Sequence, residues 1–237
     1  MTADASRRFY KEAAAVELPE GWGIALDGKR VKTPARNPLV LPTRALADAI
    51  AAEWNAQGAK VKPESMPMMQ LASTALDRVA PDRARIVNET ASYAATDLVC
   101  YRAEQPAELI RRQAETWDPL IDWVRERFDA SLVLARGIIA VSQAETTLAT
   151  LGRAVEALDD FRLTAFSVAT GAAGSLVIGL ALLEGRLTPE QSAASAQLDE
   201  LYQAERWGID REAEIRRAAQ AADLASARRF LDLLDTV

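Results

Sequence analysis

Paired carboxylates are the side chains of this sequence best suited to acid–base chemistry. Asp118 and Asp122 lie four residues apart, and Asp199 and Glu200 precede Glu205 in a second stretch of helical spacing. At such spacings one carboxyl group could donate a proton while its neighbour accepts one. In helical proteins, however, pairs of this kind are far more often solvated or capping residues. A carboxylate-dependent enzyme of unknown substrate is therefore the alternative function and not the first choice.

Few other catalytic groups are available, because the 237 residues include no histidine and a single cysteine. The lack of histidine removes the Ser-His-Asp and Cys-His types of catalysis and the commonest ligand of protein-bound zinc. Cys100 stands between Val99 and Tyr101, which favours a buried apolar role over a nucleophilic one. The sequence also contains no glycine-rich phosphate loop and no calcium loop. We therefore expect no cofactor, no metal and no catalytic residues, so that the protein is not an enzyme.

The stretch from Ser192 to Glu214 concentrates the remaining candidates. Its pattern predicts one helix that is stopped at Gly208 and a second helix whose N-cap is Asp210. We expect Glu200 to lie mid-helix, where a carboxylate is available to a partner, and Trp207 to be either a binding anchor or part of the core. A well-capped scaffold and a recognition surface fit this stretch equally well. The candidate partner-binding residues are Asp199, Glu200, Tyr202, Glu205, Trp207 and Asp210.

Two further segments carry tryptophan or methionine. In Trp117–Trp123, WDPLIDW, the proline fits a first helical turn with Asp118 as its N-cap, and the two tryptophans favour core packing. The three methionines within Met66–Met69 could form an adaptable apolar patch, although burial in the core is their commoner fate. These methionines are the second candidate for a binding surface.

The charge distribution excludes several classes of partner. The chain has 28 Lys and Arg against 34 Asp and Glu, a net charge of −6, and neither sign forms a long run. A nucleic-acid or anionic-membrane binder needs a concentrated basic surface, so we expect no nucleic acid and no stable membrane insertion. The uncharged segment Leu163–Leu183 is long enough to span a bilayer, but Gly171 and Gly174 interrupt it, which predicts two buried helices. A membrane-anchored scaffold is the second alternative.

The elements that must hold these residues fall into two groups. Between Phe9 and Thr43 the alternating pattern predicts a small antiparallel sheet, with a hairpin at Asp27-Gly28, a return strand over Lys29–Thr33 and a further strand over Leu39–Leu41. Thr43 is the predicted N-cap of the helix that follows. From Pro106 onward nearly all of the chain reads as helix.

The predicted helical segments are defined by apolar spacing, caps, glycine and proline. Leu132–Val141 lies between two of them, carries branched residues around a glycine and is expected to be extended. The helical segments are Arg44–Gln57, Met69–Val79, Asp82–Tyr93, Ala107–Phe128, Gln143–Thr170, Ser175–Glu184, Pro189–Trp207 and Asp210–Leu234.

The resulting fold class is α+β. We expect a small β-containing N-terminal domain, residues 1–80, that includes one helix, and a larger, mainly α-helical domain, residues 81–237.

Seven ordered motifs resemble one known family, the assembly chaperones of the α subunit of ATP synthase, of the type of mitochondrial assembly factor 2. Together they extend over nearly the whole chain. They are RFYKEA (Arg8–Ala13), LDGKRVKTP (Leu26–Pro34), LPTRALADAIAAEWNAQG (Leu41–Gly58), MPMMQLASTALDRV (Met66–Val79), ATDLVCYRA (Ala95–Ala103), WDPLIDW (Trp117–Trp123) and LDELYQAERWGID (Leu198–Asp210).

The resemblance implies an ATP-independent, client-specific chaperone. It implies that the protein binds the unassembled α subunit, prevents its aggregation and shields the surface that a β subunit later covers, and so supports assembly of the proton-transporting ATP synthase complex. Mitochondrial members of the family carry a targeting extension, and its absence from the printed sequence suggests a bacterial, cytoplasmic member. We expect a monomer.

Overall fold

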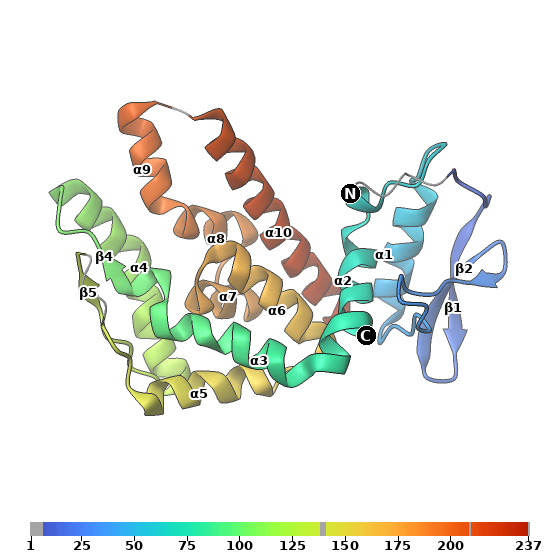
Figure 1. Ribbon diagram of the computed structural model, residues 1–237, viewed down its shortest axis with the longest axis horizontal. Coiled ribbons are helices and arrows are strands. Elements are labelled where there is room, and N and C mark those ends of the chain that lie inside the picture. Colours follow the sequence, from blue (N-terminus) through green and yellow to red (C-terminus); the bar gives the residue numbers. More distant parts are fainter. Residues whose placement is uncertain (1–6, 138–140, 209, 237) are drawn as a thin grey trace. The chain divides into compact units, whose positions relative to one another are not determined.

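The computed structural model describes residues 7–137, 141–208 and 210–236 (Figure 1). It has the expected α+β class, because a small antiparallel sheet near the N-terminus is followed by a mainly helical region. The fold class predicted from the sequence is confirmed.

The chain divides into two compact units. Unit 1 contains the described chain up to Arg83, the segment Asp160–Ala165 and the end of the chain from Arg229. Unit 2 contains Ala84–Asp159 and Phe166–Arg228. The division of the sequence at residue 80 stays a prediction, and no local sequence pattern marks the two later segments that complete unit 1.

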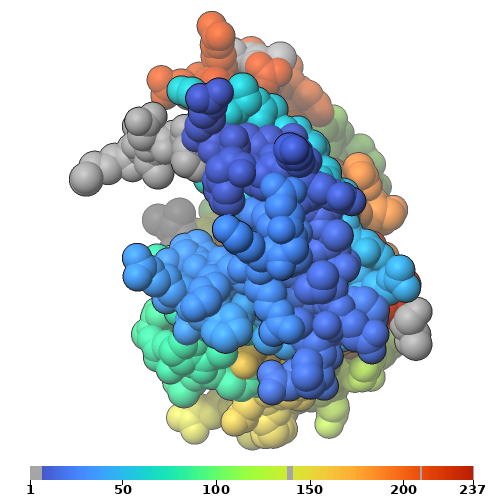
Figure 2. Space-filling view, turned by 90° about the vertical axis from the view of Figure 1, so that its right-hand side faces the viewer, coloured from blue at the N-terminus to red at the C-terminus, as the bar shows by residue number. Residues whose placement is uncertain are grey.

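The sheet of unit 1 is an antiparallel arrangement of β1 (Ala13–Leu18), β2 (Gly21–Leu26) and β3 (Lys29–Arg30). This N-terminal part of the chain, in blue, faces the viewer in Figure 2. Asp27 has φ +48° and Gly28 has φ +79°, so the predicted two-residue hairpin is confirmed. The return strand is shorter than expected, because only β3 pairs continuously with β2. Lys32 then forms an isolated bridge with Pro38.

Helix α1 (Arg44–Asn55) packs on β1 and β2 and closes the core of unit 1. Thr43 is its N-cap, as predicted, because the Thr43 hydroxyl accepts the N–H of Leu46 at 3.2 Å. Four branched aliphatic side chains of this core are at most 1% exposed: Ile24, Leu41, Leu46 and Ile50. Burial of these side chains is the main stabilising contribution to the unit.

A buried carboxylate fixes the next helix of unit 1, α2 (Pro67–Thr74). Glu53 of α1 accepts the backbone N–H groups of Met68 at 2.8 Å and of Met69 at 2.9 Å. These two donors would otherwise lack partners at the start of a helix. Burial raises the pKa of Glu53, and the two N–H groups partly oppose that shift. Glu53 thereby sets the position of the methionines.

Helix α2 continues without a break into irregular turns. A 3₁₀ turn, Pro63–Ser65, precedes it. After α2 come a π-helical turn, Ala75–Val79, and a 3₁₀ turn, Ala80–Asp82. The π-helical turn widens the helix where Ser73, Thr74, Asp77 and Arg78 line a groove that is described below.

Two segments that are distant in sequence complete unit 1. The Thr43 hydroxyl donates to the carbonyl of Leu233 at 2.7 Å. The rings of Phe161 and Phe230 stack with centroids 6.3 Å apart. Because these contacts join residues separated by 69 positions or more in the chain, sequence periodicity could not predict them.

Unit 2 is built from helices with two short strands. The elements that lie in unit 2 or extend into it are α3 (Arg83–Ser92), a 3₁₀ turn (Tyr93–Thr96), a second 3₁₀ turn (Leu98–Cys100), β4 (Tyr101–Arg102), α4 (Ala107–Phe128), β5 (Ala135–Arg136), α5 (Glu145–Glu156), α6 (Asp160–Ala173), α7 (Leu176–Leu183), α8 (Pro189–Ala196), α9 (Leu198–Trp207) and α10 (Arg211–Asp235). β4 and β5 pair in parallel, which gives the expected extended character to part of Leu132–Val141. Residues 138–140 of that prediction lie outside the described residues.

Two of the predicted helices are wrong in length. The segment Gln143–Thr170 is divided at residues 157–159 into α5 and α6, and the segment Pro189–Trp207 is divided at Gln197 into α8 and α9. Neither break contains glycine or proline, so local rules gave no signal. At the second break the Gln197 amide donates to the carbonyl of Arg217 at 2.9 Å, a tertiary contact that holds the corner.

The role predicted for Asp118 and Pro119 is also wrong. Both residues lie inside the 22-residue helix α4, so Asp118 is not an N-cap. The Asp118 carboxylate instead pairs with the Arg102 guanidinium at 2.8 Å. The buried face of α4, which includes Trp117 and Leu120, extends across the proline and outweighs its preference for a first turn.

The uncharged segment Leu163–Leu183 forms two helices, as predicted. α6 ends at Ala173, Gly174 has φ +63°, and Ser175 caps α7 by accepting the N–H of Ile178 at 3.0 Å. Within the described part of the chain, every helix falls short of the length and apolar character that a membrane crossing needs.

Asp97 ties this break to the turn before β4. Its carboxylate accepts the Ser175 hydroxyl at 2.6 Å, the N–H of Val177 at 3.0 Å and the N–H of Val99 at 3.2 Å. Asp97 is fully buried, and burial raises its pKa to about 6 although all of these bonds favour the charged form.

Candidate functional site

The corner between α9 and α10 has the geometry predicted from the sequence. α9 ends at Trp207, and Gly208 follows with φ +95°, a value that is strained for other residues. The Asp210 carboxylate accepts the N–H of Glu212 at 3.0 Å, so Asp210 caps α10. Asp210 is exposed, but this bond gives it a structural role.

Three other predicted site residues also support the fold of unit 2. Asp199 accepts the Gln113 amide at 2.7 Å, which joins α9 to α4. Burial raises the pKa of Asp199, and the hydrogen bond from the Gln113 amide opposes that shift. Glu205 pairs with Arg112 of α4 at 2.8 Å. Tyr202 is 3% exposed, so it belongs to the core and cannot serve as a surface contact.

Two cations lie close to the Tyr202 ring. The guanidinium carbon of Arg112 is 5.3 Å from the ring centroid, and that of Arg206 is 5.0 Å away. The phenol oxygen of Tyr202 is buried and has no hydrogen-bond partner in the described structure. This packing fixes the orientation of α9 on α4.

Glu200 does not lie mid-helix as predicted, because the break at Gln197 places it in the first turn of α9. Its side chain is 43% exposed, and its Oε2 atom lies 3.6 Å from Arg216 and 3.7 Å from Arg217 of α10. A carboxylate in a first turn interacts favourably with the helix dipole. Glu200 is therefore accessible to a partner and also contributes modestly to the local structure.

Trp207 is 78% exposed, which answers the question whether it is anchor or core: the ring is outside the core. Trp207 and Glu200 are seven residues apart and so lie on the same side of α9. Two further apolar side chains on these helices are exposed, Leu201 at 38% and Ile215 at 63%. We call the partly exposed Glu200 and the exposed Leu201, Trp207 and Ile215 the corner surface.

Sequence reasoning missed Leu201 and Ile215. Leu201 borders a shallow depression of about 190 Å³ that Arg112 and Glu205 also line. Ile215 stands alone among charged residues in the sequence REAEIRR, and this isolation was the available signal. An exposed apolar set ringed by charges is suited to protein contact.

The residues considered for catalysis do not converge. Asp118 pairs with Arg102, Asp122 pairs with Arg125 at 2.8 Å, and a depression of about 450 Å³ contains Asp118 but neither Asp122 nor Glu200. Within the described ranges, no three potential ligand side chains gather as a metal site would require.

Cys100 is buried, as predicted, and burial together with the charge of Asp97 raises the pKa of its thiol to about 12. The thiolate that nucleophilic attack requires is therefore strongly disfavoured at this position.

The methionines of the second candidate surface are buried. Met66 is 2% exposed, Met68 0% and Met69 9%, so they do not form an exposed patch. Trp117 is also fully buried, and its predicted core role is confirmed.

Comparison with known proteins gives concordant matches. The model of the family described as "ATP12 chaperone protein" matches residues 7–125. The chain is 27% identical over 214 residues to "Protein atp12, mitochondrial" of Schizosaccharomyces pombe, covering 85% of this chain and 74% of that protein.

Solved structures match over nearly the whole chain. The crystal structure of Atp12 from Paracoccus denitrificans is 40% identical with a TM-score of 0.93, covering 96% of this chain and 98% of that one. A protein from Agrobacterium tumefaciens is 38% identical with a TM-score of 0.92, covering 97% of this chain and 86% of that one.

Proposed function

We propose, from the premise that this chain belongs to the ATP12 chaperone protein family, that it binds the unassembled α subunit of ATP synthase and prevents its aggregation. The family makes the chain an assembly chaperone of ATP synthase. The identity of the client subunit, the absence of catalysis and the independence from ATP are the finer parts of our proposal.

The observation that carries the proposal is the corner surface. Trp207 is 78% exposed and Ile215 is 63% exposed, and charged residues flank both in the sequence. A subunit of an obligate complex exposes a large apolar interface before assembly, and such a surface aggregates unless it is covered. Apolar anchors bind such an interface, while the charged rim steers the encounter and permits release.

The remaining features of the proposed function follow from the same reasoning. Binding and release need no chemical step, so the carboxylates act through charge alone. We place the protein in the bacterial cytoplasm, the counterpart of the mitochondrial matrix, where it acts as a monomer without cofactor or nucleic acid.

The test of the site uses charge changes at Glu200. Glu200→Lys places an ammonium group next to Arg216 and Arg217 and removes a favourable first-turn charge. We expect a loss of about 1 kcal/mol in stability and about 2–4 °C in the unfolding midpoint, with weaker suppression of α-subunit aggregation measured by light scattering. Glu200→Gln, which removes the charge without repulsion, should weaken suppression less.

The matched control is Glu126→Lys, the same charge change at an exposed position of α4. This variant should protect the α subunit as well as the wild type does. If Glu200→Lys protects as fully as Glu126→Lys, Glu200 does not contribute to client binding.

A further inference from the structure

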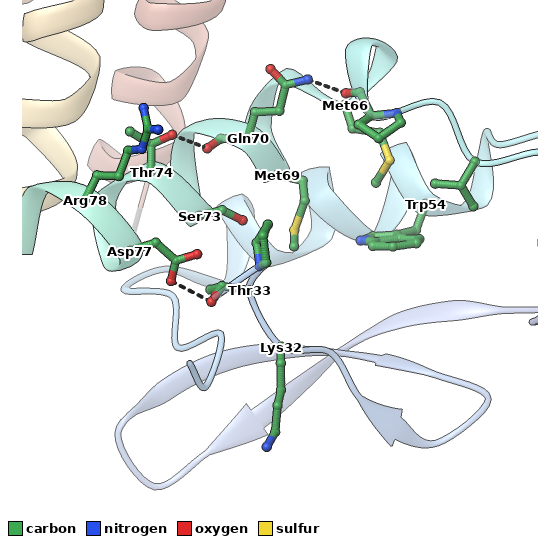
Figure 3. Close-up of a pocket in the computed structure, with 13 residues that line it drawn as sticks. Lys32, Thr33, Trp54, Met66, Met69, Gln70, Ser73, Thr74, Asp77 and Arg78 are labelled. Carbon is green, nitrogen blue, oxygen red and sulfur yellow. Dashed lines mark hydrogen bonds between the residues drawn. The ribbon is translucent and has the colours of Figure 1, made fainter. Parts of the chain in front are cut away.

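A groove in unit 1 has features of a second binding site. It has a volume of about 490 Å³ and lies among α1, α2, the π-helical turn and the loop that follows β3 (Figure 3). Trp54, Met66 and Met69 form much of its apolar wall. A pocket of this size accommodates a drug-sized group, comparable to a short stretch of extended peptide.

Two polar atoms in this groove lack partners. The indole nitrogen of Trp54 and the hydroxyl of Ser73 are buried, and neither has a hydrogen-bond partner within the described ranges. Ser73 is only 7% exposed. Figure 3 shows the two groups facing the space around the Met69 side chain from opposite sides. Buried donors without acceptors are costly and uncommon, so both groups are available to acceptors that a ligand brings into the groove.

The neighbouring hydroxyl shows that the helix itself does not prevent the Ser73 hydroxyl from forming a hydrogen bond. Thr74 donates to the carbonyl of Gln70, one turn earlier, at 2.8 Å. Ser73 could make the equivalent bond and does not. The π-helical turn that begins at Ala75 lies directly beyond it, and such turns are frequent at functional sites.

The charges at the rim define the partner further. Lys32 and Arg78 are exposed lining residues, and neither forms an ion pair in the part of the chain that the structure describes. The Lys32 side chain extends away from the other lining side chains in Figure 3, so Arg78 is the cation placed to meet a ligand. The one acidic lining residue, Asp77, already accepts hydrogen bonds from Thr33 at 2.6 Å and from the N–H of Ala35 at 3.0 Å. Long cationic side chains beside a satisfied carboxylate favour a ligand that carries negative charge.

We propose that this groove binds an extended segment of the client that combines an apolar side chain with a nearby carboxylate. Backbone carbonyls of the segment accept from Trp54 and Ser73, the apolar side chain packs on the methionines, and the carboxylate lies near Arg78. The proposal rests on the proposed function, because it takes the segment from the α subunit.

The test measures fluorescence anisotropy with labelled 12-residue peptides that cover the ATP synthase α subunit, and a parallel set from the β subunit. Peptides with the apolar and acidic pattern should bind the wild-type chain. Ser73→Ala and Trp54→Phe, which each remove one donor, should weaken their binding by about threefold to tenfold. Ser92→Ala, which removes a hydroxyl elsewhere, should have no effect.

Stability provides a second readout. Because the Ser73 hydroxyl is unpartnered in the free protein, Ser73→Ala should leave the unfolding midpoint unchanged or raise it. A lowered midpoint together with unchanged peptide affinity would show a purely structural role and overturn the proposal.

The remaining outcomes distinguish an error in the proposed groove from an error in the proposed client. If no α-subunit peptide binds, or if binding ignores both substitutions, the groove is not the site. A dimer that Ser73→Ala dissociates would also overturn the proposal, in favour of self-association. Equal, groove-dependent binding of α and β peptides would support the groove while contradicting the client specificity of the proposed function.

Discussion

Trp117→Ala is expected to destabilise unit 2 by about 3–5 kcal/mol, the cost of truncating a large buried aromatic residue. Trp117 is 0% exposed, and its indole N–H donates to the carbonyl of Ser195 at 3.0 Å, which joins α4 to α8. The guanidinium of Arg102 lies 5.3 Å from its ring centroid. The substitution leaves a cavity and an unpaired carbonyl, and the unfolding midpoint should fall by about 10 °C.

Thermal unfolding followed by circular dichroism measures this effect, with Trp117→Phe as the graded control. Phenylalanine keeps an aromatic ring but loses the N–H, so about 1–3 kcal/mol should be lost. A Trp117→Ala variant that unfolds within 2 or 3 °C of the wild type would contradict the burial on which our description of unit 2 depends.

Trp207→Ala is expected to weaken client binding while leaving the stability of the protein nearly unchanged. Because Trp207 is 78% exposed, its truncation should change stability by about 0.5 kcal/mol or less. If the ring is a binding anchor, the loss is of the hot-spot class, about 2 kcal/mol, which weakens α-subunit binding about thirtyfold. Isothermal titration of the purified α subunit would measure this affinity.

Phe9→Ala is the matched control for Trp207→Ala. Phe9 is another exposed aromatic residue, 73% exposed, and it belongs to unit 1. Its truncation should leave the affinity for the α subunit nearly unchanged. Equal effects of the two substitutions would indicate nonspecific apolar contact. If neither substitution changes the affinity, the corner surface does not bind the α subunit.

Local chemistry predicted those parts of the fold that short-range backbone geometry decides. The hairpin at Asp27-Gly28, the cap at Thr43 and the end of α9 at Gly208 all follow from preferences of single residues. The break at Gln197 was missed because a contact with Arg217, 20 residues later, determines it. Contacts between residues distant in the sequence likewise place residues 160–165 and the chain from Arg229 in unit 1.

At the candidate site, the sequence was likewise insufficient to predict which side chains are exposed. Trp117 and Trp207 are the same residue type near helical apolar faces, yet one is fully buried and the other is mostly exposed. Tyr202 looked like a contact residue and is core, while Ile215 looked unremarkable and is exposed. The groove at Trp54 and Ser73 was not predicted, because its unpartnered donors become visible only when all neighbouring atoms are placed.

The most direct measurement of client-specific, ATP-independent protection is light scattering of isolated ATP synthase subunits diluted from denaturant. We predict that an equimolar amount of this chain suppresses aggregation of the α subunit without ATP and has little effect on the β subunit. Equal suppression of both subunits, or suppression only when ATP is added, would contradict the account.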